Sequence, residues 1–327
     1  MPGAVTRATA FWADGRGGGR LLEEELPSPD DGEVLVRTLR TGISRGTEAL
    51  VFRGGVPESE HARMRAPFQE GSFPGPVKYG YLNVGVVEDG PPELSGRTVF
   101  TLFPHQSAFV VPASAVSPVP SDVPPRRAVL AGALETAVNV LWDAALLVGD
   151  RIAVVGAGMI GCAVARLASG VPGTDVVLVD IDEGKADVAE RLGVGFAHPD
   201  EARTGFDLVV DTSGSEAGLR VALEAVVTEG EVIVASWYGD GMVGLPLGAD
   251  FHSRRLTIRS SQVGMVSPRR RGARTPADRL GLALRLLRDP AYDALLTGSS
   301  SWRDLPAVMA DVVARPSVLC HSIDWET

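Results

Sequence analysis

The chain has few of the residues that build metal frameworks or support amine chemistry. Its 327 residues include two cysteines, Cys162 and Cys320, so neither a disulfide framework nor a four-cysteine zinc site can form. The lysines are Lys78 and Lys185, which leaves Schiff-base chemistry almost without candidates. Five histidines occur, but no two have the spacing of an H-E-x-x-H helix. The sequence therefore carries no local metal signature.

Basic charge and long apolar runs are also scarce. Asp and Glu number 41 against 31 Lys and Arg, and the net charge of −10 argues against a nucleic-acid partner, because phosphate contacts need a basic face. The longest uncharged apolar run, residues 152–165, is shorter than the ~20 residues of a membrane span. The first twenty residues hold Asp and Arg where a signal peptide has its apolar segment. We expect a cytoplasmic protein with no nucleic-acid or membrane partner.

The chain changes character about a third of the way along, and its length suggests about two domains. Up to about residue 120, alternating segments such as EVLVRTLRTGI lie between turn residues and predict short β-strands. Residues 54–79 contain several prolines and little periodicity, which is typical of a functional loop or lid. From Asp150 onward, nearly all-apolar strands alternate with helices, which indicates a parallel sheet covered on both faces. The expected fold class is α/β, with a β-rich domain followed by a doubly wound parallel sheet.

The strongest motif is GAGMIG at residues 156–161, which follows the apolar strand IAVV and opens a helix. Gly156 allows a tight turn, Gly158 lets a pyrophosphate approach the backbone, and Gly161 lets the helix pack closely on the strand. Met159 and Ile160 belong to the helix N-terminus, whose unpaired N–H groups and partial positive charge attract phosphate. The segment therefore predicts a dinucleotide-binding site.

Asp180 indicates which dinucleotide is bound. It ends the next strand, nineteen residues after the last glycine, where a carboxylate accepts hydrogen bonds from ribose hydroxyls and repels a 2′-phosphate. Its neighbours are Ile181 and Asp182 rather than arginine, and Lys185 and Arg191 could serve NADP only by reaching back. The sequence therefore favours NAD over NADP.

Three more residues are candidates for cofactor binding because they follow later strands of the expected sheet. Thr212 and Ser213 end the fourth strand, at the carboxyl edge where such sheets bind ligands. Trp237 follows the fifth strand and either lines the nicotinamide pocket or belongs to the core.

Longer segments resemble a known superfamily. No tyrosine has a lysine four residues later, which excludes the short-chain dehydrogenases. The segments VRTLRTGISRGTEALVFRG, KYGYLNVGVVEDG and LAGALETAVNVLW resemble the medium-chain dehydrogenase/reductase superfamily, and the resemblance covers essentially the whole chain. It implies an N-terminal GroES-like catalytic domain at 1–126, completed by 265–327, and a Rossmann NAD-binding domain at 127–264. It also implies a homodimer joined at the edge of the cofactor sheet.

The zinc-ligand positions of that superfamily carry other residues here. Ser44 stands in place of the catalytic cysteine, and Tyr81 and Leu82 replace the His and Glu of the G-H-E triplet. Glu135, in ALET, lies near where some members have a carboxylate ligand. Zinc prefers thiolate, imidazole and carboxylate ligands, so we expect no metal. With GISRGTE, GY and SWYG, the chain is similar to a zinc-lacking branch, bacteriochlorophyllide a dehydrogenase, which implies oxidation of a secondary alcohol to a ketone or the reverse.

Without zinc, a hydrogen-bonding side chain has to polarise the carbonyl oxygen or deprotonate the alcohol. Tyr81 is one candidate, unless its hydroxyl is bonded to backbone. His105, in LFPHQSAF, titrates in the right range, and the alternative is a surface histidine. Glu48 and Glu135 could orient Arg45 or Tyr81 or relay a proton, although Glu135 could simply be a helix-start carboxylate. Ser44 can donate a hydrogen bond to the substrate or the cofactor.

These observations predict an NAD-dependent, zinc-independent alcohol dehydrogenase or ketone reductase that acts on a small molecule. One alternative is an enone or quinone reductase of the same superfamily, although those enzymes usually prefer NADPH, which Asp180 opposes. The other is a binding protein that senses NAD(H) and catalyses nothing, because a fold does not by itself imply an activity.

Overall fold

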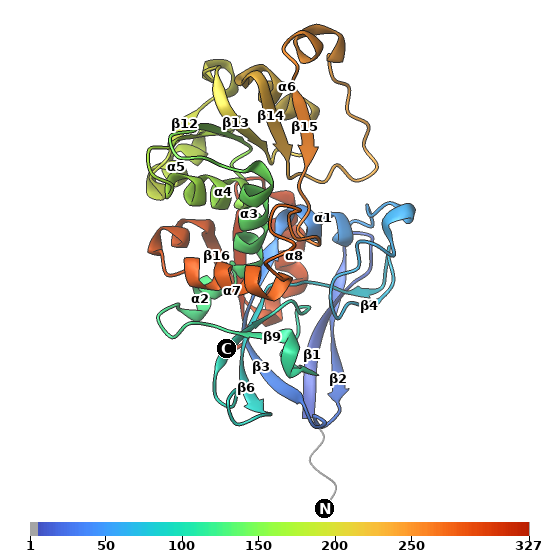
Figure 1. Cartoon of the computed structure of the whole chain (residues 1–327). Helices are drawn as coiled ribbons and strands as arrows, with labels where there is room; N and C mark the ends of the chain where they lie inside the picture. The colour runs from blue at the N-terminus through green and yellow to red at the C-terminus, as the bar shows by residue number, and fades with distance from the viewer. Residues whose placement is uncertain (1–5, 327) are drawn as a thin grey trace, which may run out of the picture. The chain divides into compact units, whose positions relative to one another are not determined.

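The computed structural model describes residues 6–326, which form two compact units (Figure 1). Unit 1 comprises residues 6–132, Leu284–Arg288 and 296–326. Unit 2 comprises Ala133–Ala283 and Asp289–Leu295. Residues 265–283, expected with the N-terminal domain, therefore group with unit 2. The expected domain bounds otherwise stay a prediction.

Unit 1 is built from two β-sheets. Its four-stranded sheet has the order β2-β1-β5-β4, and its seven-stranded sheet has the order β16-β17-β3-β6-β7-β9, with β8 also paired to β3. The strands are β1 (Thr6–Ala13), β2 (Gly19–Leu26), β3 (Glu33–Ser44), β4 (Glu70–Gly71), β5 (Val77–Lys78), β6 (Asn83–Asp89), β7 (Thr98–Thr101), β8 (Ala108–Pro112), β9 (Val116–Pro118), β16 (Leu296–Ser301) and β17 (Cys320–Asp324). The expected lid at 54–79 contains β4 and β5.

Strand β3 organises the larger sheet of unit 1. Alternate residues such as Val34 and Val36 are fully buried, as the polar and apolar alternation of the sequence predicts. They pack with Val99 and Phe109 in a common apolar cluster. β17 pairs antiparallel to β3 and places Cys320 opposite Ser44. The helices of this unit are α1 (Arg45–Phe52), α2 (Pro125–Ala128) and α8 (Leu305–Ala314).

Unit 2 is a six-stranded sheet in the order β12-β11-β10-β13-β14-β15, in which every neighbouring pair is parallel. Its strands are β10 (Arg151–Val155), β11 (Asp175–Val179), β12 (Gly195–Ala197), β13 (Phe206–Asp211), β14 (Val226–Val234) and β15 (Thr257–Ser260). Its helices are α3 (Ala131–Ala144), α4 (Met159–Ser169), α5 (Ala186–Leu192), α6 (Glu216–Ala225) and α7 (Pro276–Leu286), of which α3 begins, and α7 ends, in unit 1.

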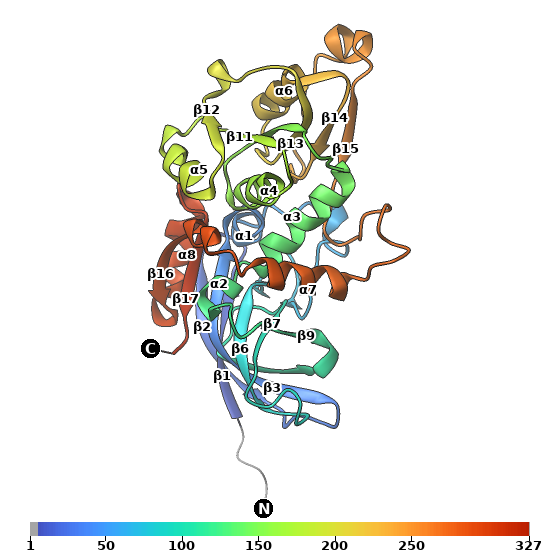
Figure 2. The ribbon, with the colours of Figure 1, turned by 60° about the vertical axis from the view of Figure 1, so that its left-hand side comes forward.

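The strand order of unit 2 makes its sheet doubly wound. The chain moves from β10 outward to β11 and β12, and then returns to the other side of β10 for β13, β14 and β15. Because parallel crossovers are right-handed, these opposite directions put α4 and α6 on opposite faces of the sheet (Figure 2). The expected α/β fold, with a β-rich unit and a doubly wound unit, is confirmed. Among residues 6–326, no helix combines the length and apolar character needed to cross a membrane.

Candidate functional site

The glycine turn of unit 2 connects β10 to α4, and its geometry requires glycine. Gly156 has φ +100°, and a Cβ there would lie 2.7 Å from the Ser213 nitrogen. A Cβ on Gly161 would lie 1.9 Å from the Gly156 carbonyl oxygen, so α4 can approach the turn only without a side chain. A Cβ on Gly158 would meet no atom within 4 Å. Packing therefore does not explain Gly158, which leaves open space at the start of α4.

The first turn of α4 presents its N–H groups to this open space. Gly158 is the N-cap residue and provides no side chain to cap the helix, and Met159 and Ile160 are the first two helical residues. Uncapped N–H groups and the helix dipole together favour an anion. The turn therefore fits a pyrophosphate, as the sequence predicts.

Asp180 follows β11 and is fixed by backbone donors. Its carboxylate accepts a hydrogen bond from the Ala157 N–H at 2.6 Å and from the Asp182 N–H at 2.9 Å. These bonds hold the charged group beside the glycine turn, where a ribose of a bound dinucleotide would lie. Lys185 is buried, and Arg191 is exposed on α5. The pairing of Asp180 with Ala157 is a detail that the sequence did not indicate.

The ends of β13 and β14 form a second polar group in unit 2. Thr212 donates through its hydroxyl to the Gly156 carbonyl at 2.7 Å, so it braces the glycine turn. Asp211 is fully buried and accepts hydrogen bonds from the Ser213 hydroxyl at 2.6 Å and from the Tyr238 hydroxyl at 2.7 Å. Trp237 is half-buried beside Tyr238. Asp211 and Tyr238, which end and follow the same two strands, thus belong to one group with the predicted cofactor residues Thr212 and Ser213.

His105 lies at the centre of a buried polar cluster in unit 1. It is 1% exposed, and its Nε2 lies 2.8 Å from the Glu48 carboxylate, while its Nδ1 lies 2.7 Å from the Thr41 hydroxyl. Thr41 also accepts a hydrogen bond from the Trp325 indole at 3.0 Å. A neutral imidazole protonated at Nε2 satisfies all of these contacts. His105 is therefore not a surface residue, and neither ring nitrogen is left to contact a substrate.

Glu48 joins this cluster to the start of α1. It is 3% exposed, and one carboxylate oxygen contacts His105 while the other accepts a hydrogen bond from the Ser44 N–H at 2.7 Å. The hydrogen-bond partners of Glu48 are thus Ser44 and His105, rather than the Arg45 or Tyr81 expected from the sequence. An acidic side chain in the first turn of a helix can satisfy a free N–H in this way.

The Tyr81 hydroxyl forms hydrogen bonds with the Ser44 and Thr47 side chains. Burial raises the pKa of Tyr81 to about 12, and the negative charge of Glu48 acts in the same direction. Hydrogen bonds with Ser44 and Thr47 oppose that rise. Tyr81 is therefore protonated at neutral pH, so that its hydroxyl is a hydrogen-bond donor rather than a base.

The positions where the superfamily carries zinc ligands do not form a zinc-type donor set. Leu82 is 1% exposed and packs close to Gly42 and Gly132, so it is part of the core. Ser44 and Tyr81 provide only hydroxyl groups. Within residues 6–326, no three His, Cys, Asp or Glu side chains are placed to hold a metal ion together. Zinc does not fit these residues.

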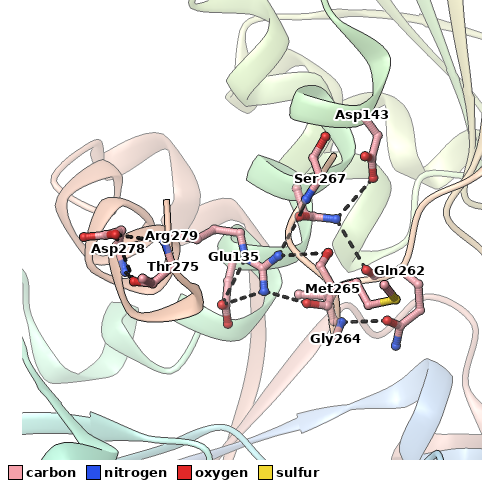
Figure 3. A network of polar contacts seen from close by, with 11 residues as sticks. Glu135, Asp143, Gln262, Gly264, Met265, Ser267, Thr275, Asp278 and Arg279 are labelled. Atoms are coloured by element: carbon pink, nitrogen blue, oxygen red, sulfur yellow. Dashed lines mark hydrogen bonds and ion pairs between the residues drawn. The ribbon is translucent and has the colours of Figure 1, made fainter. Parts of the chain in front are cut away.

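Glu135 belongs to another network, in unit 2. Its carboxylate lies 3.1 Å from the Arg279 guanidinium, and both side chains are buried (Figure 3). Burial raises the pKa of Glu135, and the positive charge of Arg279 opposes this rise. The partner of Glu135 is thus Arg279, rather than the Arg45 or Tyr81 expected from the sequence. Arg279 was missed, although Glu135, Asn139 and Asp143 recur at four-residue intervals on α3.

Comparisons with known proteins agree with the fold. No family model matches the chain. An L-threonine 3-dehydrogenase from Deinococcus radiodurans is 23% identical over 70% of this chain and 73% of its own length. L-idonate 5-dehydrogenase from Escherichia coli K-12 superposes with a TM-score of 0.81 at 16% identity, covering 98% of this chain and 99% of the other.

Two other solved structures contain a nicotinamide cofactor. A protein from Sinorhizobium meliloti 1021 assigned as a zinc-binding dehydrogenase was solved with NADP and has a TM-score of 0.79 at 16% identity, covering 98% of this chain and 99% of that one. An alcohol dehydrogenase from E. coli CFT073 was solved with NADH and has a TM-score of 0.75 at 16% identity, with the same coverage. These similarities show that the chain has the same fold as these dehydrogenases of known structure.

Proposed function

We propose that this chain is an NAD(H)-dependent oxidoreductase that interconverts a secondary alcohol and a ketone without zinc. The observation that carries the proposal is the glycine turn of unit 2. Gly158 leaves open space at an uncapped helix N-terminus, and Asp180 is fixed beside it. Dehydrogenases among the relatives and structural neighbours support an oxidoreductase, and the solved structures with NADP and NADH support a nicotinamide dinucleotide.

The residues of unit 2 have separate tasks in this proposal. The N–H groups of Met159 and Ile160 bind the pyrophosphate, and Gly158 gives it room. Asp180 accepts hydrogen bonds from the ribose hydroxyls and disfavours a 2′-phosphate, which supports NAD over NADP. When bound, the nicotinamide ring donates or accepts the hydride.

In unit 1, Tyr81 is the proposed acid. Because its pKa is raised to about 12, it is protonated at neutral pH and donates a hydrogen bond to the carbonyl oxygen of a ketone. Ser44 and Thr47 are associated with this hydroxyl and orient it. Glu48 and His105 act through contacts within the cluster and are positioning residues, since Glu48 fixes the Ser44 backbone and His105 fixes Glu48. In this protonation state Tyr81 can act as the acid in ketone reduction.

Zinc independence rests on the donor chemistry. Ser44, Tyr81 and Leu82 stand at the positions of three ligand-type residues, and Leu82 is part of the core. The similarity to the bacteriochlorophyllide a dehydrogenase branch supports the reaction type only, not its substrate. The carboxylate of Asp180 disfavours NADPH, and with it the enone or quinone reductase alternative.

Two binding measurements and one activity screen test the proposal. Titration should show that NADH binds at least about tenfold more tightly than NADPH, and the opposite order would overturn the role of Asp180. Metal analysis should find substoichiometric zinc, whereas one zinc per chain would overturn the role of Tyr81. A panel of secondary alcohols and ketones should include one with stereospecific hydride transfer. An NADH-binding protein inactive on the whole panel would favour the sensor alternative.

A homodimer is proposed as well. β15 lies at the end of the strand order in unit 2, and an edge strand exposes N–H and C=O groups that a second copy can pair. Sedimentation should therefore give twice the chain mass of 34.3 kDa, and a monomer at micromolar concentration would contradict this. A cytoplasmic location also stays a proposal.

A further inference from the structure

The segment that follows β15 is partly exposed to solvent, but its backbone is hydrogen-bonded to a buried arginine. Residues 261–265 follow the carboxyl end of β15, and the Met265 side chain is 62% exposed. The carbonyl oxygens of Val263 and Met265 nevertheless accept hydrogen bonds from the Arg279 guanidinium, at 2.5 and 3.4 Å (Figure 3). Arg279 is itself only 2% exposed. An exposed loop is usually mobile, but this one is held from within the unit.

Arg279 is fixed by the start of α7 and by α3. Thr275 and Asp278 exchange hydrogen bonds between backbone N–H groups and side chains, as in a capping box, so the first turn of α7 is defined. From the next position, Arg279 contacts the Glu135 carboxylate at 3.1 Å and donates to the Asn139 side-chain oxygen at 2.5 Å. Its planar fork therefore joins two side chains of α3 to two backbone carbonyls.

Ser261, at the start of the segment, and Ser267, two residues beyond its end, are also attached to α3. Ser261 donates to the Asp143 carboxylate at 2.6 Å, and the Ser267 N–H donates to Asn139 at 3.1 Å. Asn139 in turn donates to Asp143 at 3.2 Å. The face of α3 that carries Glu135, Asn139 and Asp143 thus holds the whole segment.

Folding stability alone does not explain this network. A buried ion pair loses about as much free energy in desolvation as it gains in attraction, and apolar residues of similar volume often serve equally well. What the guanidinium adds is directional: it fixes the two carbonyl groups in one orientation. The hydrogen bonds from Arg279 thus indicate that the network controls the conformation of the segment.

Strand order shows which half of a dinucleotide the segment would meet. The glycine turn follows β10, and Asp180 follows β11 on one side of it. A dinucleotide with its pyrophosphate at β10 and its adenosine ribose at β11 extends its other half over β13, β14 and β15. β15 lies three strand spacings from β10, at about 4.8 Å each. The segment therefore lies on the nicotinamide side.

We propose that Arg279, with Glu135, is a positioning residue that presets residues 261–265 as a contact for the nicotinamide ribose half of the cofactor. This rests on the proposed function. Because the segment is ordered before the cofactor arrives, binding does not have to order it. Arg279 acts through the carbonyls of Val263 and Met265 and does not touch the cofactor itself.

The test compares NADH with ADP-ribose, which lacks the nicotinamide. Arg279→Met alone would leave Glu135 buried without a partner and could unfold the unit. The double variant R279M/E135M removes both charges, and its fold can be checked by thermal unfolding. We expect its Kd for NADH to rise about tenfold and its Kd for ADP-ribose to stay within about twofold, because only the nicotinamide half loses a preset contact.

Arg166→Met is the matched control. Arg166 pairs with Asp289 at 2.7 Å within unit 2, on α4 but away from the segment, and its loss should leave the ratio of the two Kd values unchanged. Equal weakening of NADH and ADP-ribose in R279M/E135M, or no weakening of either, would overturn the positioning role. If the unmodified protein bound neither NADH nor ADP-ribose, the proposed function itself would fail.

Discussion

The two candidate sites are assembled from the chain in different ways. In unit 2, the glycine turn and Asp180 belong to one continuous stretch, the connection from β10 to the end of β11. In unit 1, the polar cluster joins Thr41, Glu48, His105 and Trp325, and the bond between Thr41 and Trp325 connects residues 284 positions apart. When a site comes from one stretch of the chain, its residues have a characteristic spacing that can be recognised in the sequence. When a site comes from distant stretches, the sequence shows no such spacing.

The largest effect is expected from Glu48 in unit 1. Glu48→Ala would leave the Ser44 N–H and the His105 Nε2–H buried without an acceptor, so the free energy of unfolding should fall by about 3 kcal/mol. Denaturant unfolding measures this, and the NADH affinity of the folded protein should not change. Glu58→Ala, at an exposed position of the same unit, is the control. A loss under about 1 kcal/mol would show that the cluster is not a cooperative unit.

Tyr81→Phe should lower kcat for ketone reduction about a hundredfold while leaving NADH affinity intact, because it removes only the proposed donor. Since the pKa of Tyr81 is about 12, the rate with the unmodified protein should show no titration of this group below about pH 10. Steady-state kinetics from pH 6 to 9 measures both. A variant that retained full activity would remove Tyr81 from the mechanism.

Gly158→Ala tests the proposed pyrophosphate site of unit 2. The added methyl group has no atom within 4 Å, so thermal stability should not fall, but it occupies the space proposed for the pyrophosphate. We expect the Kd for NADH to rise at least about tenfold. Gly248→Ala, where the new Cβ also has open space, should change neither property. Unchanged NADH affinity in Gly158→Ala would place the pyrophosphate elsewhere.

A smaller change is expected for Asp180→Asn, which keeps an acceptor for the Ala157 N–H but removes the charge. The preference for NADH over NADPH should fall by about three- to tenfold, because the repulsion of a 2′-phosphate is lost. Titration of both cofactors against the variant measures it. A preference equal to that of the unmodified protein would mean that another group selects the cofactor.

The difference in assembly explains what the sequence could predict. The strand, glycine turn and helix at 151–169 follow from local rules, because the positive φ of Gly156 and the close approach of Gly161 to the Gly156 carbonyl both lie within that segment. His105 could be chosen as a candidate from its residue type, but its burial and its bonds to Thr41 and Glu48 depend on the packing of distant strands. Arg279 could not be paired with Glu135 across 144 positions without the fold. Only the four-residue spacing on α3 gave a signal.

The pairing of β17 with β3 also sets an order of events during synthesis. Unit 2 ends at Leu295, whereas the larger sheet of unit 1 needs β17, which the ribosome makes later. Until Trp325 leaves the ribosome, Thr41 lacks its indole donor and β3 lacks one of its neighbours. The proposed acid–base region, which includes residues of β3, is therefore completed only after unit 2 has been made.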